Sequence, residues 1–164
     1  KNHLSLELEE YSQIVRKLKR LVSDLNALDA KLSVKLSLKQ LPSKIIMREL
    51  AASLNLSPIS KEGYAKRNES GQTLFSIFPS IEKIGLDLVM DLPRVSNPSH
   101  AFNVMFDCGE WLASNLDGKL TDEKGTQLTH EEKKIILGQV NKKQLALKKF
   151  GLVPGGNLAA RIFN

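Results

Sequence analysis

The stretch GLDLVMDLPRV, residues 85–95, decides the expected fold, because its side chains alternate as in a β-strand with one covered face. Four apolar residues share one face of this strand: Leu86, Leu88, Met90 and Leu92. Asp87 and Asp91 share the other face, and Val89 lies between them, where water is expected. A single exposed valine is ordinary in a strand. The alternative interpretation is that this face of the sheet contacts a partner.

Length and composition predict one globular domain. The chain has 164 residues, of which 41% are hydrophobic and 26% charged, a balance typical of folded proteins. Its net charge of +6 permits an acidic partner, a nucleic acid or an anionic membrane surface, and identifies none of them. The single cysteine, Cys108, excludes an intrachain disulfide and is typical of a reducing compartment. A start at Lys1 without an apolar leader predicts a fragment or a processed form.

Hydrophobic periodicity predicts a mixture of helices and antiparallel strands. Apolar stripes predict helices over residues 6–28, 43–54, 98–116 and 130–149. Alternation predicts strands over residues 32–38, 59–67, 73–79 and 86–92. The second and third of these strands form a hairpin, because NESGQ (68–72) between them has the residues of a turn. Residues 119–129 predict two short strands around a tight turn, and residues 151–164 predict a tail.

Helix boundaries are marked by capping residues. Ser43 predicts the N-cap of the second helix, and Asn97, followed by a proline, predicts that of the third. Thr129 and Glu132 form a capping box for the fourth helix, and Gly118 is expected to end the third. The third helix should bury one stripe and its flanks: Ala101, Met105, Cys108, Leu112, Phe102, Phe106 and Trp111. The second helix should bury Ile46, Leu50 and Leu54.

Amphipathic helices combined with half-polar strands predict the fold class. We expect an α+β fold in which an antiparallel sheet has helices packed on one face only. The other face then stays open to solvent. By alternation, Ser76, Phe78 and Val89 project from this open face.

Residues with reactive side chains do not form a recognisable catalytic or metal site. His3, His100 and His130 are far apart in the sequence and lack ligand spacing. Cys108 lies on an apolar helical stripe without a basic neighbour that would lower its pKa. The sequence also lacks a phosphate-binding glycine loop and a G-x-S-x-G nucleophile motif. We therefore expect neither an enzyme nor a cofactor.

Basic clusters on the predicted helices leave nucleic-acid binding as an alternative, but the open sheet face argues against it. Lysines and arginines with apolar partners inward are typical of a solvated helical face. Nucleic-acid recognition on a sheet needs exposed aromatic side chains beside positive charge. Phe78 is the one good exposed aromatic candidate there, and the nearby Asp87 and Asp91 would repel phosphate.

Four stretches together carry a family resemblance: TLFSIFPS (73–80), LDLVMDLPRV (86–95), HAFNVMFDCGEWLASNLDGKLTDEKGTQLT (100–129) and GLVPGGNLAARIFN (151–164). With these stretches the chain resembles the ZipA C-terminal, FtsZ-binding domain family, and most closely its betaproteobacterial type. The resemblance begins at residue 31. It therefore implies a ZipA C-terminal-like domain over 31–164, preceded by an N-terminal helical extension over 1–30.

The resemblance implies a fold related to that of the TATA-binding protein, whose open sheet face holds a shallow hydrophobic cavity. In the family, this cavity binds the C-terminal tail peptide of the tubulin-like division protein FtsZ. Full-length members carry an N-terminal membrane anchor and a linker, which places the domain on the cytoplasmic side of the bacterial inner membrane. The implied role is a cell-division adaptor without small-molecule substrate, tethered to the membrane only through a segment absent from this chain.

Carried over by position, the cavity residues of the family fall on Phe78, Ser80 and Val89. With Ser76 and the first strand added by alternation, the expected peptide-binding residues are Phe78, Ser80, Val89, Ser76, Lys35 and Gly63. Two registers stay open for the strand over 59–67. Either Lys61, Gly63 and Ala65 or Ser60, Glu62 and Tyr64 face outward.

The chain departs from the family where Ser80 and Gly63 replace bulky apolar side chains. At about 25 cal/mol per Å2 of apolar area, Phe78 and Val89 contribute only a few kcal/mol against the cost of ordering a peptide. We therefore expect micromolar binding at best, strengthened where filaments present many tails. Three alternatives remain: a basic nucleic-acid-binding domain of related fold, an interaction domain with a different peptide partner, and a domain that pairs through the helix over 6–28.

Overall fold

The computed structural model describes residues 12–13, 15–16, 20 and 31–162. The chain divides into two units, residues 1–30 and 31–164, and each is described by itself. The described residues of the first unit are helical. The rest of the helix predicted over 6–28, with its apolar stripe, lies outside the described residues.

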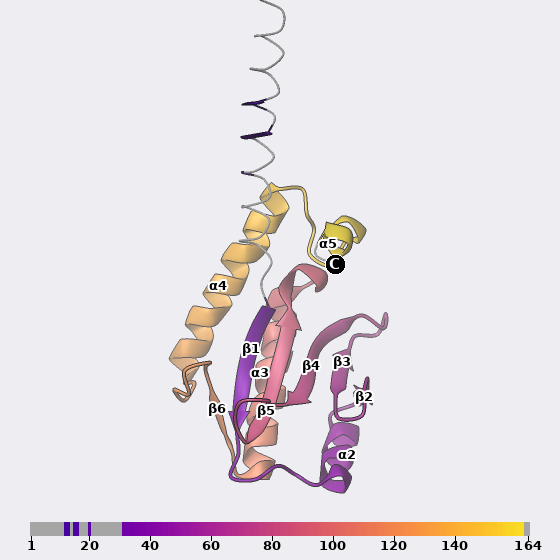
Figure 1. Cartoon of the computed structure of the whole chain (residues 1–164), viewed down its shortest axis with the longest axis vertical. Coiled ribbons are helices and arrows are strands. Elements are labelled where there is room, and N and C mark those ends of the chain that lie inside the picture. The colour runs from indigo at the N-terminus through magenta and orange to yellow at the C-terminus, as the bar shows by residue number, and fades with distance from the viewer. Residues whose placement is uncertain (1–11, 14, 17–19, 21–30, 163–164) are drawn as a thin grey trace, which may run out of the picture. The chain divides into compact units, whose positions relative to one another are not determined.

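The second unit is built on a six-stranded antiparallel sheet with the strand order β2-β3-β4-β5-β1-β6 (Figure 1). Its strands are β1 (Lys31–Ser37), β2 (Leu56–Pro58), β3 (Tyr64–Arg67), β4 (Thr73–Pro79), β5 (Gly85–Asp91) and β6 (Lys119–Thr121). Residues 85–91 of the stretch GLDLVMDLPRV form β5, which lies between β4 and β1. Its predicted alternation is confirmed, because Leu86, Leu88 and Met90 are at most 3% exposed.

Four helices and one short 3-10 helix complete the unit. They are α2 (Lys44–Ser53), η1 (Leu92–Arg94), α3 (Pro98–Leu116), α4 (His130–Lys149) and α5 (Asn157–Ile162). The predicted caps are confirmed: Ser43 accepts a hydrogen bond from the Ile46 amide, and Asn97 accepts one from the His100 amide. Both hydrogen bonds of the predicted capping box of α4 are present.

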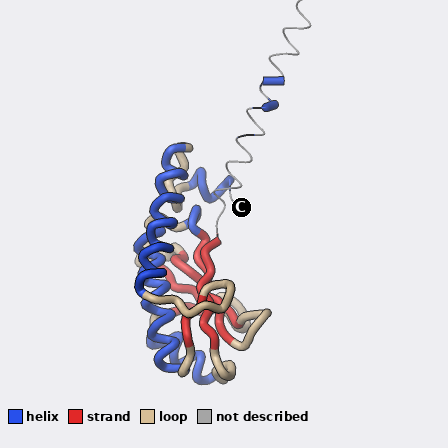
Figure 2. Tube along the Cα trace, turned by 90° about the vertical axis from the view of Figure 1, so that its left-hand side faces the viewer, coloured by secondary structure: helices blue, strands red, loops and turns tan. Residues whose placement is uncertain are grey.

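The predicted α+β architecture is confirmed, with the helices α3 and α4 along one side of the sheet (Figure 2). The core lies between α3 and the sheet. Its largest fully buried side chains are Phe75, Phe102, Phe106, Leu36, Ile77, Leu88, Met90, Leu92, Met105, Leu112, Leu147 and Val34. The packing of a helix on one face directs alternate residues of every strand either into this core or onto the opposite, open face.

The strand predicted over 59–67 is wrong in extent. Within this range the structure has only β3 (Tyr64–Arg67), which pairs with β4 on one side and, on the other, with β2, a short strand that ends just before the range begins. β2 contains Pro58 and pairs only with β3, at the edge of the sheet. Proline is tolerated in an edge strand because its missing N–H faces away from the neighbouring strand.

Four smaller predictions also need correction. The second short strand in 119–129 is reduced to one bridge between Thr121 and Gln127. The left-handed residue after α3 is Asp117, with φ of 51°, and not Gly118. Trp111 is 37% exposed rather than buried beside the stripe of α3, and Ile46 of α2 is 46% exposed.

Candidate functional site

The open face of the sheet is formed by the residues that alternate with the core residues of β1, β4 and β5. The register places Ser76 of β4, Val89 of β5 and Ser33 of β1 in one row across the sheet. The next row holds Phe78, Asp87 and Lys35. The residues that were predicted to face outward on β1, β4 and β5 are therefore direct neighbours and form one surface.

The first hollow on this face, which we call the apolar hollow, has a volume of about 320 Å3. It is lined by Lys31, Thr73, Leu74, Phe75, Ser76, Phe78, Val89, Asp91, Arg94 and Val95. Leu74, Phe78 and Val89 supply aliphatic and aromatic surface, and Phe78 is 37% exposed. At the rim, the Arg94 Nε lies 3.2 Å from the Asp91 Oδ2. The hollow therefore combines apolar walls with a charged rim.

The register that the sequence left open follows from the pairing of β3 with β4. Tyr64 pairs with Ile77, which is a core residue, so Tyr64 lies on the covered face. Ala65 pairs with Ser76 and therefore lies on the open face. Gly63 lies beside Phe78, since a Cβ on Gly63 would come within 2.7 Å of the Phe78 Cε1 atom. The absence of a side chain at Gly63 thus allows the Phe78 ring to lie close against the backbone.

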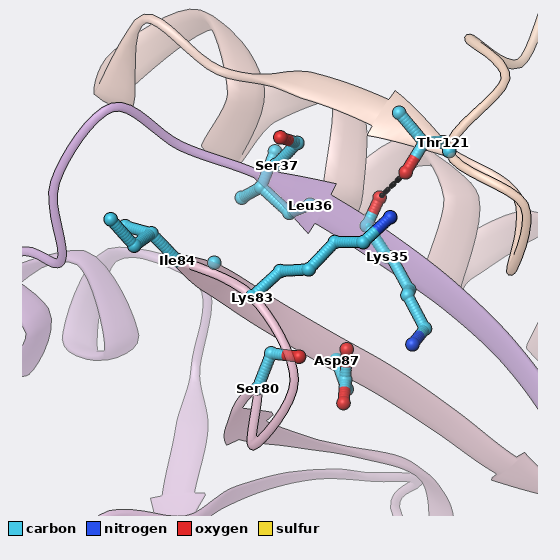
Figure 3. A pocket seen from close by; sticks show the side chains of 10 residues that line it. Lys35, Leu36, Ser37, Ser80, Lys83, Ile84, Asp87 and Thr121 are labelled. Atoms are coloured by element: carbon cyan, nitrogen blue, oxygen red, sulfur yellow. Dashed lines mark hydrogen bonds between the residues drawn. The ribbon is translucent and has the colours of Figure 1, made fainter.

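A second hollow, which we call the polar hollow, has a volume of about 100 Å3 and lies on the far side of the Phe78–Asp87 row (Figure 3). Its charged and hydroxyl-bearing lining residues are Lys35, Ser37, Ser80, Lys83, Asp87 and Thr121. The Ser80 Oγ and the Asp87 Oδ1 are buried and have no hydrogen-bond partner within residues 31–162. Buried polar atoms normally have a partner. A ligand that reaches this hollow is therefore favoured when it donates a hydrogen bond.

An ion pair orders one side of the polar hollow. The Lys35 Nζ donates a hydrogen bond to the Glu82 Oε2 at 2.9 Å. This hydrogen bond raises the pKa of Lys35, and it lowers the pKa of Glu82 below its usual range. Both groups are therefore charged at neutral pH. Lys83 contributes a second ammonium group to the lining.

The predicted site residues are divided between these features. Ser76, Phe78 and Val89 line the apolar hollow, whereas Lys35 and Ser80 line the polar hollow. Gly63 lies against the ring of Phe78 and lines neither hollow.

Sequence reasoning missed Leu74 and Lys83. Leu74 was not detectable by alternation, because the register between β3 and β4 shifts beside it and Leu74 and Phe75 are both buried. Lys83 was not detectable by periodicity, because it belongs to the irregular connection between β4 and β5.

The reactive side chains lie elsewhere. Cys108 is buried in α3, and this burial raises the pKa of its thiol to about 11. A thiol that resists ionisation is a poor nucleophile. In the part of the chain that the structure describes, no three His, Cys, Asp or Glu side chains are grouped as metal ligands would be.

Among the helices that the structure describes, no stretch combines the length and the hydropathy of a membrane span.

Comparison with known proteins assigns a family to this fold and face. The family model described as "ZipA, C-terminal FtsZ-binding domain" matches residues 46–139, more than half of the chain. No curated protein matches the chain. The matched region extends from α2 into α4 and includes β4 and β5, which carry most of the open face. The chain therefore belongs to the family of ZipA C-terminal domains, non-enzymatic interaction domains that bind FtsZ in cell division.

Proposed function

We propose that this domain binds the C-terminal tail peptide of FtsZ on the open face of its sheet. The observation that carries the proposal is the apolar hollow around Phe78 and Val89, on a face that no described helix covers. The peptide would place apolar side chains in this hollow and run toward the polar hollow. The proposed contact residues are Phe78, Ser80, Val89, Ser76 and Lys35, with Gly63 supporting the ring of Phe78.

The chemistry of the face predicts weak binding by a single domain. Phe78 and Val89 are the apolar side chains of the hollow that can add contact area, because Leu74, which also lines it, is already 93% covered within the domain. At about 25 cal/mol per Å2, the remaining apolar area contributes only a few kcal/mol before the cost of ordering the peptide is subtracted. Micromolar affinity follows, and filaments that present many tails to many domains would increase it.

In the cell, the domain would help to tether the division ring to the membrane. We propose that residues 31–164 are the FtsZ-binding domain of a protein of betaproteobacterial type and that residues 1–30 are a helical extension of it. The tether would act on the cytoplasmic side of the inner membrane.

The test is a titration of the domain with a fluorescently labelled peptide copied from the host FtsZ C-terminus, at two salt concentrations. Val89→Asp should abolish saturable binding, because a charge would then lie on the wall of the apolar hollow. Gln139→Asp is the matched control, since it adds the same charge at an exposed position of α4. Circular dichroism should show that both variants stay folded.

Two results would contradict the proposal. One is the absence of binding at about millimolar peptide, a concentration that would detect even interactions of about 4 kcal/mol. The other is equal binding by the Val89→Asp variant and the original protein. Salt-sensitive binding of a nucleic-acid probe that depends on lysines of the helices rather than on Val89 would favour the nucleic-acid alternative instead.

A further inference from the structure

A third hollow, which we call the α2 groove, lies on the opposite side of the sheet from the proposed FtsZ site. It has a volume of about 220 Å3 and is lined by Leu41, Pro42, Lys44, Met47, Arg48, Lys61, Glu62, Tyr64, Ile77, Pro79 and Leu86. Tyr64, Ile77 and Leu86 belong to the covered face of the sheet, as their register shows. None of the lining residues belongs to α3 or α4, so the groove opens beside α2 where the long helices do not reach.

The segment that forms one wall of this groove exposes apolar side chains. Leu41, which lines the groove, is 48% exposed. Ile45 and Ile46 of α2 do not line it but are also exposed, by 70% and 46%. In contrast, Ala51 is the one fully buried residue of α2, and Met47 is half-buried in the wall of the groove. Contiguous exposed apolar residues of this kind mark interaction surfaces in soluble proteins.

The rim of the α2 groove determines the chemistry of its partner. Lys44, Arg48 and Lys61 contribute three positive charges to the lining, and Glu62 contributes one negative charge. No ion pair within residues 31–162 involves Lys44, Arg48 or Lys61. In addition, α2 has no acidic residue in its first turn, where the helix dipole favours negative charge.

We propose that the α2 groove is a second docking site, whose partner is a peptide segment with apolar side chains flanked by acidic residues. The apolar side chains would contact Leu41, Met47 and Tyr64, and the acidic ones would pair with Lys44 and Arg48. Because the groove and the apolar hollow lie on opposite faces of the sheet, both sites can be occupied at once. The inference goes beyond the proposed FtsZ site and shares no residue with it.

The probe is a synthetic peptide of about twelve residues in which leucine and glutamate alternate, titrated into isotope-labelled protein and followed by backbone amide NMR shifts. A matched peptide carries lysine in place of glutamate. The glutamate peptide should shift the amide signals of Met47, Tyr64 and their neighbours and should bind at least about tenfold more tightly than the lysine peptide. Raising the salt concentration should weaken this binding.

Two double variants test whether the amide shifts report binding of the glutamate peptide in the α2 groove. The double variant Lys44→Glu/Arg48→Glu should reduce the affinity for the glutamate peptide at least about tenfold, because the rim charge changes sign. The control Lys142→Glu/Lys148→Glu makes the same change of charge at exposed positions of α4 and should leave the affinity unchanged.

Three results would overturn the proposal: no saturable shifts at about millimolar glutamate peptide, equal affinity for the lysine peptide, or the same loss of affinity in both double variants. The Val89→Asp variant separates the two sites. If it still binds the glutamate peptide but not the FtsZ tail, both proposals hold. If it loses both, the glutamate peptide binds the open face and the α2 groove is not a docking site. Failure of the FtsZ tail to bind the original protein contradicts only the earlier proposal.

Discussion

The two faces of β5 are formed by alternate residues of the strand and have different surroundings. Leu86, Leu88 and Met90 point into the core and are at most 3% exposed. Asp87 and Val89, from the same strand, point onto the open face and line the two hollows found there. A strand can do both because successive side chains project to opposite sides of a sheet. Alternate residues of one short stretch thus form the core and line the hollows of the open face.

The neighbours of an exposed apolar residue on adjacent strands decide whether it belongs to an apolar surface. Val89 has polar neighbours along its own strand, but across the sheet it lies in a row with Ser76 and adjoins Phe78 in the apolar hollow. Its exposure is explained by its neighbours on other strands. The covered face needs no such explanation, because any apolar side chain of suitable size stabilises a core.

The largest expected effect comes from the covered face. Leu88→Ala should lower the free energy of unfolding by about 2–5 kcal/mol, because Leu88 is fully buried and its truncation leaves a cavity in the core. Val89→Ala, one residue further on, should lower it by less than about 1 kcal/mol. Urea denaturation followed by circular dichroism measures both. Equal losses would show that the open face contributes to stability as much as the core does.

The next effect concerns binding. Phe78→Ala should weaken the affinity for the FtsZ tail about tenfold or more, because the ring supplies much of the apolar surface of the hollow. Trp111→Ala is a matched control, since Phe78 and Trp111 are both 37% exposed but Trp111 lies on α3. Peptide titration of both variants makes the comparison. A similar loss in both would mean that any exposed aromatic residue attracts this peptide.

Burial of Cys108 in α3 predicts that its thiol reacts differently in the folded and the unfolded protein. The Cys108 thiol has its pKa raised by burial from 9.0 to about 11, so its thiolate fraction at pH 8 should be about 100-fold below that of an unfolded chain. A disulfide reagent should therefore modify the native protein slowly and the urea-unfolded protein at once. Between pH 9 and 11 the unfolded thiol loses its proton while the folded one keeps it, so this group makes stability fall as pH rises through that window. Rapid labelling of native protein would contradict this account.

The smallest effect is expected in the polar hollow. Asp87→Asn should leave the free energy of unfolding unchanged or raise it by about 1 kcal/mol, because the buried Oδ1 accepts no hydrogen bond within residues 31–162. Peptide affinity should change much less than in Phe78→Ala. Thermal unfolding and the same titration measure the two quantities. A clear loss of stability would show that the carboxylate supports the fold rather than a ligand.

Most of the architecture was predictable from local patterns. The alternation in β5, the cap at Asn97 and the capping box at Thr129 depend on residues a few positions apart, so short-range chemistry is sufficient. The strand β2 was not predictable, because three residues including Pro58 form a strand only when β3 is beside them. The α2 groove was also missed. The periodicity of α2 assigned Ile46 to the core, whereas the packing of Met47 and Ala51 leaves Ile46 at the surface.

The sequence by itself determined which residues of each strand share a face, where the three capped helices begin, and that Phe78 and Val89 face outward. These properties follow from side-chain spacing along one segment and need no knowledge of its neighbours. Only the tertiary structure decided the position of Gly63 beside Phe78, the division of the open face into an apolar and a polar hollow, and the groove beside α2. Each of these depends on the register between strands or on the placement of a loop. Contacts between distant segments determine both, and no local pattern in the chain encodes them.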